Sequence, residues 1–77
     1  MDRTPIVVDD QRMYALTKND ANQFFLEVVV GGMAMETLVI PLNEVEVASY
    51  AEQGKRFLDS LAVDVCRSTQ EFRNRAV

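Results

Sequence analysis

The sequence has no histidine and no tryptophan, and only one cysteine, two prolines and three glycines among 77 residues. Histidine is the commonest general base, so its absence argues against Ser/His/Asp or Cys/His catalysis, and it excludes a histidine-based metal site. The single cysteine, Cys66, excludes an intrachain disulfide. A chain this short buries only about 60% of the surface that its unfolded form exposes. We therefore expect extra burial to come from association with another protein chain.

Long hydrophobic runs and an excess of positive charge are also missing. The apolar stretches are too short to span a bilayer, and the first residues lack the basic and apolar regions of a signal peptide. A lone thiol without an export signal is typical of the cytoplasm, so we expect a cytosolic protein of bacterial type with no membrane contact. Twelve acidic and eight basic residues give a net charge of −4. This balance argues against nucleic-acid binding, which depends on cationic side chains.

The first half of the chain has the composition of β-strands. Residues 6–8 form a short β-branched run, residues 13–16 a weaker one, and residues 18–22 a polar turn between it and the next strand. Residues 24–30 are rich in aromatic and β-branched side chains and predict the strongest strand. Gly31-Gly32 suits a tight hairpin, after which residues 35–40 return antiparallel. The pattern predicts a meander of three strands, or of four if residues 6–8 pair.

The second half predicts one long amphipathic helix over residues 44–66. Asn43 is a good N-cap, and Glu46 three residues later completes a capping box. Apolar residues then recur at helical spacing and form a stripe of the width that faces a core. Its members are Val47, Tyr50, Ala51, Gly54, Leu58, Leu61, Ala62 and Val65. The expected class is therefore α+β, with a single domain made of a sheet over residues 6–41 and a helix on one of its faces.

Two features near the helix have alternative interpretations. Gly54 could break the helix, because glycine costs about 0.5–1 kcal/mol relative to alanine within one. The apolar phase continues through it, however, so we predict an unbroken helix in which Gly54 allows close approach to the sheet. Ser68 and Glu71 suggest a second capping box that opens a short helical turn over residues 69–75. We expect Arg67 to complement the helix C-terminus, and Arg73 and Arg75 to be solvated.

The predicted sheet has more apolar surface than one helix can cover. A two-residue loop would place Glu27 opposite Glu36, which is unfavourable, so we predict a three-residue loop that gathers Phe24, Leu26, Val28, Leu38 and Ile40 on the core face. The other face then keeps apolar side chains, and such a patch usually marks an interaction surface. The residues predicted for this interface are Phe25, Val29, Met35 and Val39. The alternative is that the C-terminal segment, with Phe72, folds back over this second face.

Other chemistry has little support. Asp9-Asp10 and the pair Glu27 and Glu36 are the only candidates for carboxylate catalysis or cation binding, and neither has calcium-loop spacing. Cys66 lies at the edge of the helix stripe and is interpreted as a small residue flanking the core. Tyr14 and Tyr50 are interpreted as core residues with a solvated hydroxyl. We predict no catalytic residue, no metal and no cofactor.

The leading hypothesis is a non-enzymatic protein that works by protein–protein contact, as a homodimer through the second sheet face. A second hypothesis is an acidic inhibitor or immunity-type partner of a basic protein, with electrostatically steered association. Its contact surface would contain Glu27, Glu36, Glu44 and Glu46, with Asp59 nearby. A third is a small-molecule binding module with a cleft between helix and sheet near Tyr14, Tyr50 and Gly54.

Overall fold

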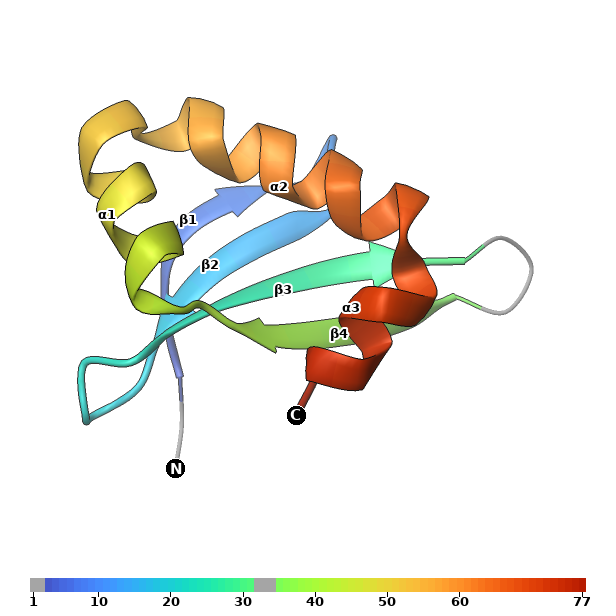
Figure 1. The fold of residues 1–77 in the computed structure, drawn as a ribbon, viewed down its shortest axis with the longest axis horizontal. Helices are drawn as coiled ribbons and strands as arrows, with labels where there is room; N and C mark the ends of the chain where they lie inside the picture. Colours follow the sequence, from blue (N-terminus) through green and yellow to red (C-terminus); the bar gives the residue numbers. More distant parts are fainter. Residues whose placement is uncertain (1–2, 32–34) are drawn as a thin grey trace.

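The computed structural model describes residues 3–31 and 35–77, which form an antiparallel sheet followed by helices (Figure 1). The strands of this part of the chain are β1 (Thr4–Asp9), β2 (Tyr14–Lys18), β3 (Phe24–Val30) and β4 (Glu36–Pro41), and its helices are α1 (Glu44–Gln53), α2 (Lys55–Arg67) and α3 (Thr69–Arg75). The strand order is β1-β2-β3-β4, so each strand pairs with its neighbour in sequence. The predicted α+β class and antiparallel meander are confirmed. Because β1 pairs with β2, the meander has four strands and not three.

The second strand and its turn lie slightly later than predicted. β2 begins at Tyr14 and ends at Lys18. The Asn19 side chain then organises the loop, because its Oδ1 accepts the backbone N–H groups of Ala21 and Gln23, both at 3.0 Å. This is the local hydrogen bonding that makes asparagine a turn residue. Asn22 also has a positive φ of 61°, which asparagine tolerates better than most residues.

The β3–β4 hairpin has the predicted core face but a longer connection. Val28 pairs with Leu38, and Val30 pairs with Glu36. The prediction of a three-residue loop is therefore wrong by two residues, because five residues separate the paired positions Val30 and Glu36. A shift of two preserves the alternation of faces, so the apolar side chains still point to one side. Gly31 has a φ of 96°, as the hairpin prediction requires, whereas Gly32 lies outside the described residues.

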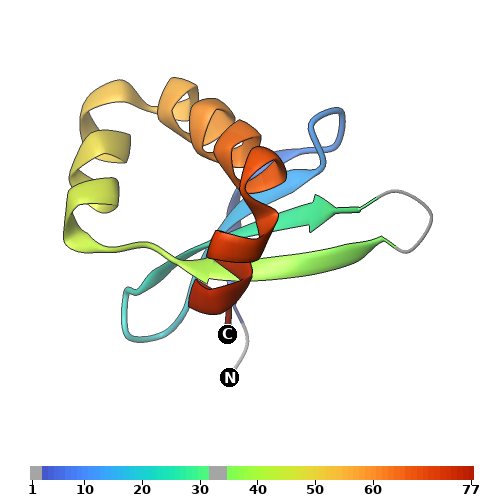
Figure 2. The same ribbon diagram turned by 45° about the vertical axis from the view of Figure 1, so that its right-hand side comes forward.

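The core lies between α2 and one face of the sheet. Leu58 and Val65 of α2 are fully buried there, against strand residues such as Leu16, Leu26 and Ile40. Figures 1 and 2 show α2 lying across this face, while α1 stands at the end of the sheet near the β2–β3 loop. The sheet face turned away from α2 is called the second sheet face below.

The prediction of one unbroken helix over residues 44–66 is wrong. Gly54 separates α1 from α2, with φ 68° and ψ −144°. Only glycine adopts this backbone conformation readily, so Gly54 turns the chain between α1 and α2 instead of allowing close approach to the sheet. A Cβ atom built at Gly54 would meet nothing within 4 Å. The N-terminal prediction is correct, because Asn43 and Glu46 form the capping box at 2.8 and 2.9 Å.

The C-terminal segment covers the edge of β4 and part of the core, and it does not lie on the second sheet face. Phe72 and Ala76 pack against the core cluster, and the Val77 N–H donates to the Val39 carbonyl at 2.9 Å. Ser68 is the N-cap residue of α3, but its side chain makes no capping hydrogen bond, so the second capping box is not formed. Thr69 instead donates its hydroxyl to the Val65 carbonyl at 2.9 Å.

Two arginines of the C-terminal segment form ion pairs with the rest of the chain. The prediction that both are solvated is wrong for the half-buried Arg75, whereas Arg73 stays exposed. Arg75 donates to Glu46 Oε1 at 2.6 Å and to the Pro41 carbonyl at 3.0 Å. Arg73 forms an ion pair with Glu36. A charge-assisted pair is stronger than a neutral hydrogen bond, so these contacts help to hold α3 against β4.

Candidate functional site

The strand register determines which side chains share the second sheet face. Val8, Ala15, Glu27 and Val39 form one row across the four strands. A neighbouring row contains Thr17, Phe25 and Pro41, and a third contains Val29 and Thr37. The predicted interface residues Phe25, Val29 and Val39 therefore lie on this face. Met35 lies just before the first residue of β4, so the strand pairing assigns it to neither face.

These four residues differ in how much surface they present. Met35 is 61% exposed, and Val29 and Val39 are half-buried. Phe25 is only 7% exposed. The Arg3 guanidinium lies 5.4 Å from the centre of the Phe25 ring, which is the geometry of a cation–π contact. Phe25 is thus covered within its own chain, while the other three contribute to the surface.

A polar cluster occupies the middle of the second sheet face. Arg3 Nε donates to Glu27 Oε2 at 3.0 Å, and the Thr17 hydroxyl donates to the same oxygen at 2.8 Å. Thr17 is buried, and Glu27 keeps its hydrogen-bond partners within the chain. The cluster divides the face, so the apolar surface is concentrated toward the β1–β2 turn.

A hollow of about 350 Å³ lies at that end of the face. Its apolar lining comes from Val8, Met13, Ala15 and Val29, with Asp10 and Glu27 among the polar lining residues. Val8 is 58% exposed and Met13 43% exposed. Val8 and Met13 were not among the predicted interface residues. The β-branched character of residues 6–8 and the position of Met13 before a strand were the signals that could have indicated them.

The four acidic residues of the inhibitor hypothesis do not share one free surface. Glu27 pairs with Arg3, Glu36 with Arg73, and Glu46 with Arg75. Burial raises the pKa of Glu46, but hydrogen bonds from Arg75 and the Asn43 backbone outweigh it and the net shift is downward. Glu44 is exposed in the first turn of α1 and has no ion-pair partner in the described part of the chain. The inhibitor hypothesis stays a prediction. Fewer unpaired acidic side chains support it than the net charge of the chain suggests.

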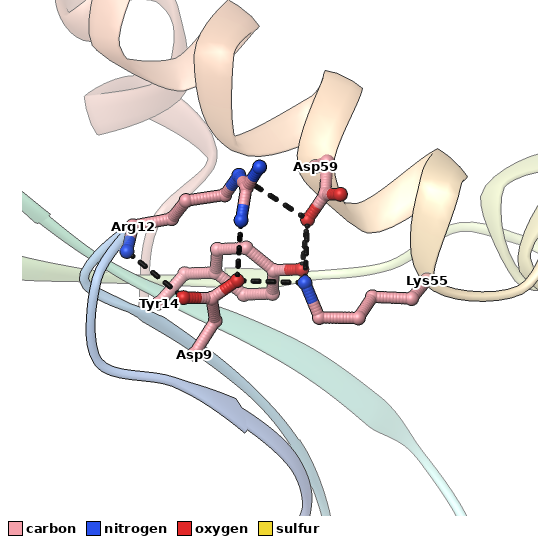
Figure 3. A network of polar contacts seen from close by, with 5 residues as sticks. All are labelled: Asp9, Arg12, Tyr14, Lys55 and Asp59. Carbon is pink, nitrogen blue, oxygen red and sulfur yellow. Dashed lines mark hydrogen bonds and ion pairs between the residues drawn. The ribbon is translucent and has the colours of Figure 1, made fainter.

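A network of polar side chains joins the β1–β2 turn to α2 (Figure 3). Lys55 Nζ donates to Asp9 Oδ2 at 2.6 Å and to Asp59 Oδ1 at 3.0 Å. The Tyr14 hydroxyl donates to the same Asp59 oxygen at 2.5 Å. Arg12 donates its backbone N–H to Asp9 Oδ1 at 2.9 Å and its Nη1 to Asp9 Oδ2 at 3.1 Å. The Arg12 Nε lies 3.8 Å from Asp59 Oδ1.

The charges of this network hold each ionisable group in one protonation state. Hydrogen bonds from Lys55 and from the Arg12 backbone lower the pKa of Asp9, and those from Tyr14 and Lys55 lower the pKa of Asp59. The carboxylates in turn raise the pKa of Lys55. Burial, assisted by the hydrogen bond to Asp59, raises the pKa of Tyr14 to about 12. Near neutral pH both carboxylates and both cations are charged, so the network carries no net charge.

This arrangement suits a structural role better than a catalytic one. A general base or nucleophile needs a pKa near the working pH, whereas these groups are shifted away from it. Each charge has a partner of opposite sign within hydrogen-bond distance. We infer that the network fixes the β1–β2 turn against α2. Sequence reasoning missed it because Asp9 and Lys55 are far apart in the chain, although Lys55 and Asp59 have the i,i+4 spacing of a helix pair.

The other sequence-based candidates have these positions. Cys66 is exposed on α2, so the expectation that it flanks the core is wrong. The Tyr50 ring packs against the Phe24 ring with centroids 6.2 Å apart, and the Tyr14 hydroxyl is bound by Asp59 instead of being solvated.

Within residues 3–31 and 35–77 no group of three or more acidic or cysteine side chains is placed to hold a metal ion. In the same ranges no helix is long and apolar enough to cross a bilayer.

The cleft required by the small-molecule hypothesis does not lie at the centre of the helix–sheet contact, because fully buried side chains such as Leu16, Leu26 and Leu58 fill that region. A hollow of about 400 Å³ lies farther out, between α1 and the β2–β3 loop. Its lining includes Phe24, Leu42 and Val47. This position is near Tyr50 but not near Tyr14.

Comparison with known proteins suggests no function for these surfaces and contacts. The chain matches no protein-family model, no curated protein and no solved structure.

Proposed function

We propose that this protein is a non-enzymatic binding protein that forms a homodimer through its second sheet face. The observation that carries the proposal is the exposed apolar surface at the β1–β2 end of that face. Val8 and Met13 expose large apolar side chains there, beside the half-buried Val29. Contiguous apolar surface of this kind is typical of protein contacts, and methionine side chains adapt to a partner.

The charge distribution on the face favours a second copy over a strongly basic partner. Arg3 neutralises Glu27 in the middle of the face, so two copies can meet there without burying an unpaired Glu27 carboxylate. A two-fold contact uses the same patch on both subunits, so each copy would bring a Glu27 that is already paired with its own Arg3. Burial of this patch in a dimer would also supplement the limited core of a 77-residue chain.

The mass in solution, measured by size exclusion with light scattering over a wide concentration range, tests this proposal. We expect a mass near twice the 8.7 kDa of one chain. Val8→Glu introduces a charge at an exposed position of the patch and should yield folded monomers. Val29→Glu should do the same or unfold the protein, because Val29 is half-buried.

Val45→Glu is the matched control. Val45 is also an exposed valine, but it lies on α1, away from the second sheet face, so this variant should keep the mass of the parent protein. A parent protein that stays monomeric at the highest concentration would refute the homodimer. A dimer that survives Val8→Glu and Val29→Glu but is lost with Val45→Glu would assign the contact to α1.

A further inference from the structure

A different hollow lies along α2, on the helical side of the sheet, and it meets the proposed dimer patch only at the β1–β2 turn, where Arg12 lines the hollow and Met13 belongs to the patch. Its volume is about 300 Å³, at the lower end of the range of small-molecule sites. The lining residues are Arg12, Asp59, Ala62, Val63, Cys66 and Arg67. Ala62 is buried and Val63 is exposed, so the hollow offers apolar surface that solvent can reach.

The charges around this hollow sum to one uncompensated positive charge. Asp59 and Arg12 belong to the network with Asp9 and Lys55, in which two carboxylates balance two cations. Arg67 lies on the lining as well and has no ion-pair partner among the described residues. The chain as a whole is acidic, but charges beyond about 8–10 Å are largely screened at physiological salt. Among the lining residues Asp59 offsets Arg12, so a ligand in the hollow experiences a net positive charge that comes from Arg67.

We propose that this hollow binds a small apolar monoanion, with its hydrocarbon part against Ala62 and Val63 and its carboxylate between Arg12 and Arg67. Arg12 contacts Asp9 through Nη1 and approaches Asp59 through Nε, which leaves Nη2 available as a donor. Guanidinium groups bind carboxylates with charge-assisted hydrogen bonds. A single negative charge on the ligand matches the single uncompensated charge of Arg67.

Octanoate is a suitable probe, because it has one carboxylate and about ten non-hydrogen atoms, for which a Kd on the order of 1 mM is expected. Cys66 is the only thiol of the chain and lines the hollow, so its rate of alkylation by the neutral reagent iodoacetamide reports occupancy. We expect octanoate to slow alkylation and to shift the amide resonances of Val63 and Arg67. The neutral analogue 1-octanol should do so more weakly.

The Arg67→Glu variant should weaken octanoate binding about tenfold, because it removes one surface ion pair and adds a repulsion of similar size. Arg56→Glu is the matched control, since Arg56 is on the same helix but does not line the hollow. Equal protection by 1-octanol and octanoate would overturn the assignment of an anion. An equal loss of octanoate affinity in Arg67→Glu and Arg56→Glu would show that only the overall charge of the helix matters, and it would overturn the site. The site would also be overturned if octanoate neither slowed the alkylation of Cys66 nor shifted the amide resonances.

Discussion

The two main helices have similar apolar spacing in sequence but contribute very differently to the core. α2 buries Leu58, Leu61, Ala62 and Val65, whereas no residue of α1 is buried. Val45 of α1 is 74% exposed. The difference arises at Gly54, whose backbone turns the chain so that α1 no longer runs along the sheet (Figure 2). Periodicity therefore shows that two segments are helical, but it does not show that they share one axis.

Truncation of a core side chain should give the largest contrast between the helices. Leu58→Ala removes a fully buried side chain of α2 and should lower the free energy of unfolding by about 2–5 kcal/mol. Val45→Ala on α1 should change it by less than about 0.5 kcal/mol, as for most surface positions. Urea denaturation followed by circular dichroism measures both values. Comparable losses in the two variants would mean that α1 is packed as firmly as α2.

Gly54→Ala tests the helix break through the sign of its effect. In a continuous helix, alanine would stabilise by about 0.5–1 kcal/mol. At the observed positive φ it should instead destabilise by about 1–3 kcal/mol, because the backbone is strained for a residue with a Cβ. The open space around Gly54 removes steric clash as another cause. A gain in urea midpoint for this variant would contradict the break.

The polar network that joins the β1–β2 turn to α2 should contribute the smallest change in the free energy of unfolding, and this contribution depends on pH. Folding lowers the pKa values of Asp9 and Asp59, so their contribution is present above about pH 4 and is lost as the pH falls below it. Asp59→Asn should therefore flatten the fall of the urea midpoint between about pH 6 and 3. Asp20→Asn, at an exposed position of the β2–β3 loop, serves as the control. Identical slopes in the parent and Asp59→Asn would refute this role of the network.

The sequence predicted the features that depend on local signals. The capping box of Asn43 and Glu46 was found because its two residues are three apart. The core face of β3 and β4 was found because alternation survives a shift of two residues. The predicted length of the β3–β4 loop was wrong, because the same alternation cannot distinguish strand registers that differ by two residues.

The missed features depend on tertiary contacts. Gly54 keeps the apolar phase, so only its observed dihedral angles show the break. Arg75 binds Glu46, and Asp9 binds Lys55, across long stretches of chain that no spacing rule connects. The second sheet face was correctly expected to carry Val29 and Val39. Its polar centre was missed, because Arg3 reaches Glu27 from the N-terminal end of the chain.

The meander order of the sheet also has a consequence for folding. Each strand pairs with the strand just before it, so the hairpins can close as the chain emerges during synthesis, without waiting for distant segments. The apolar face of that nascent sheet stays uncovered until Leu58, Leu61 and Val65 have been added. The interval between completion of β4 and docking of α2 is therefore the stage at which we expect this protein to be most prone to aggregation.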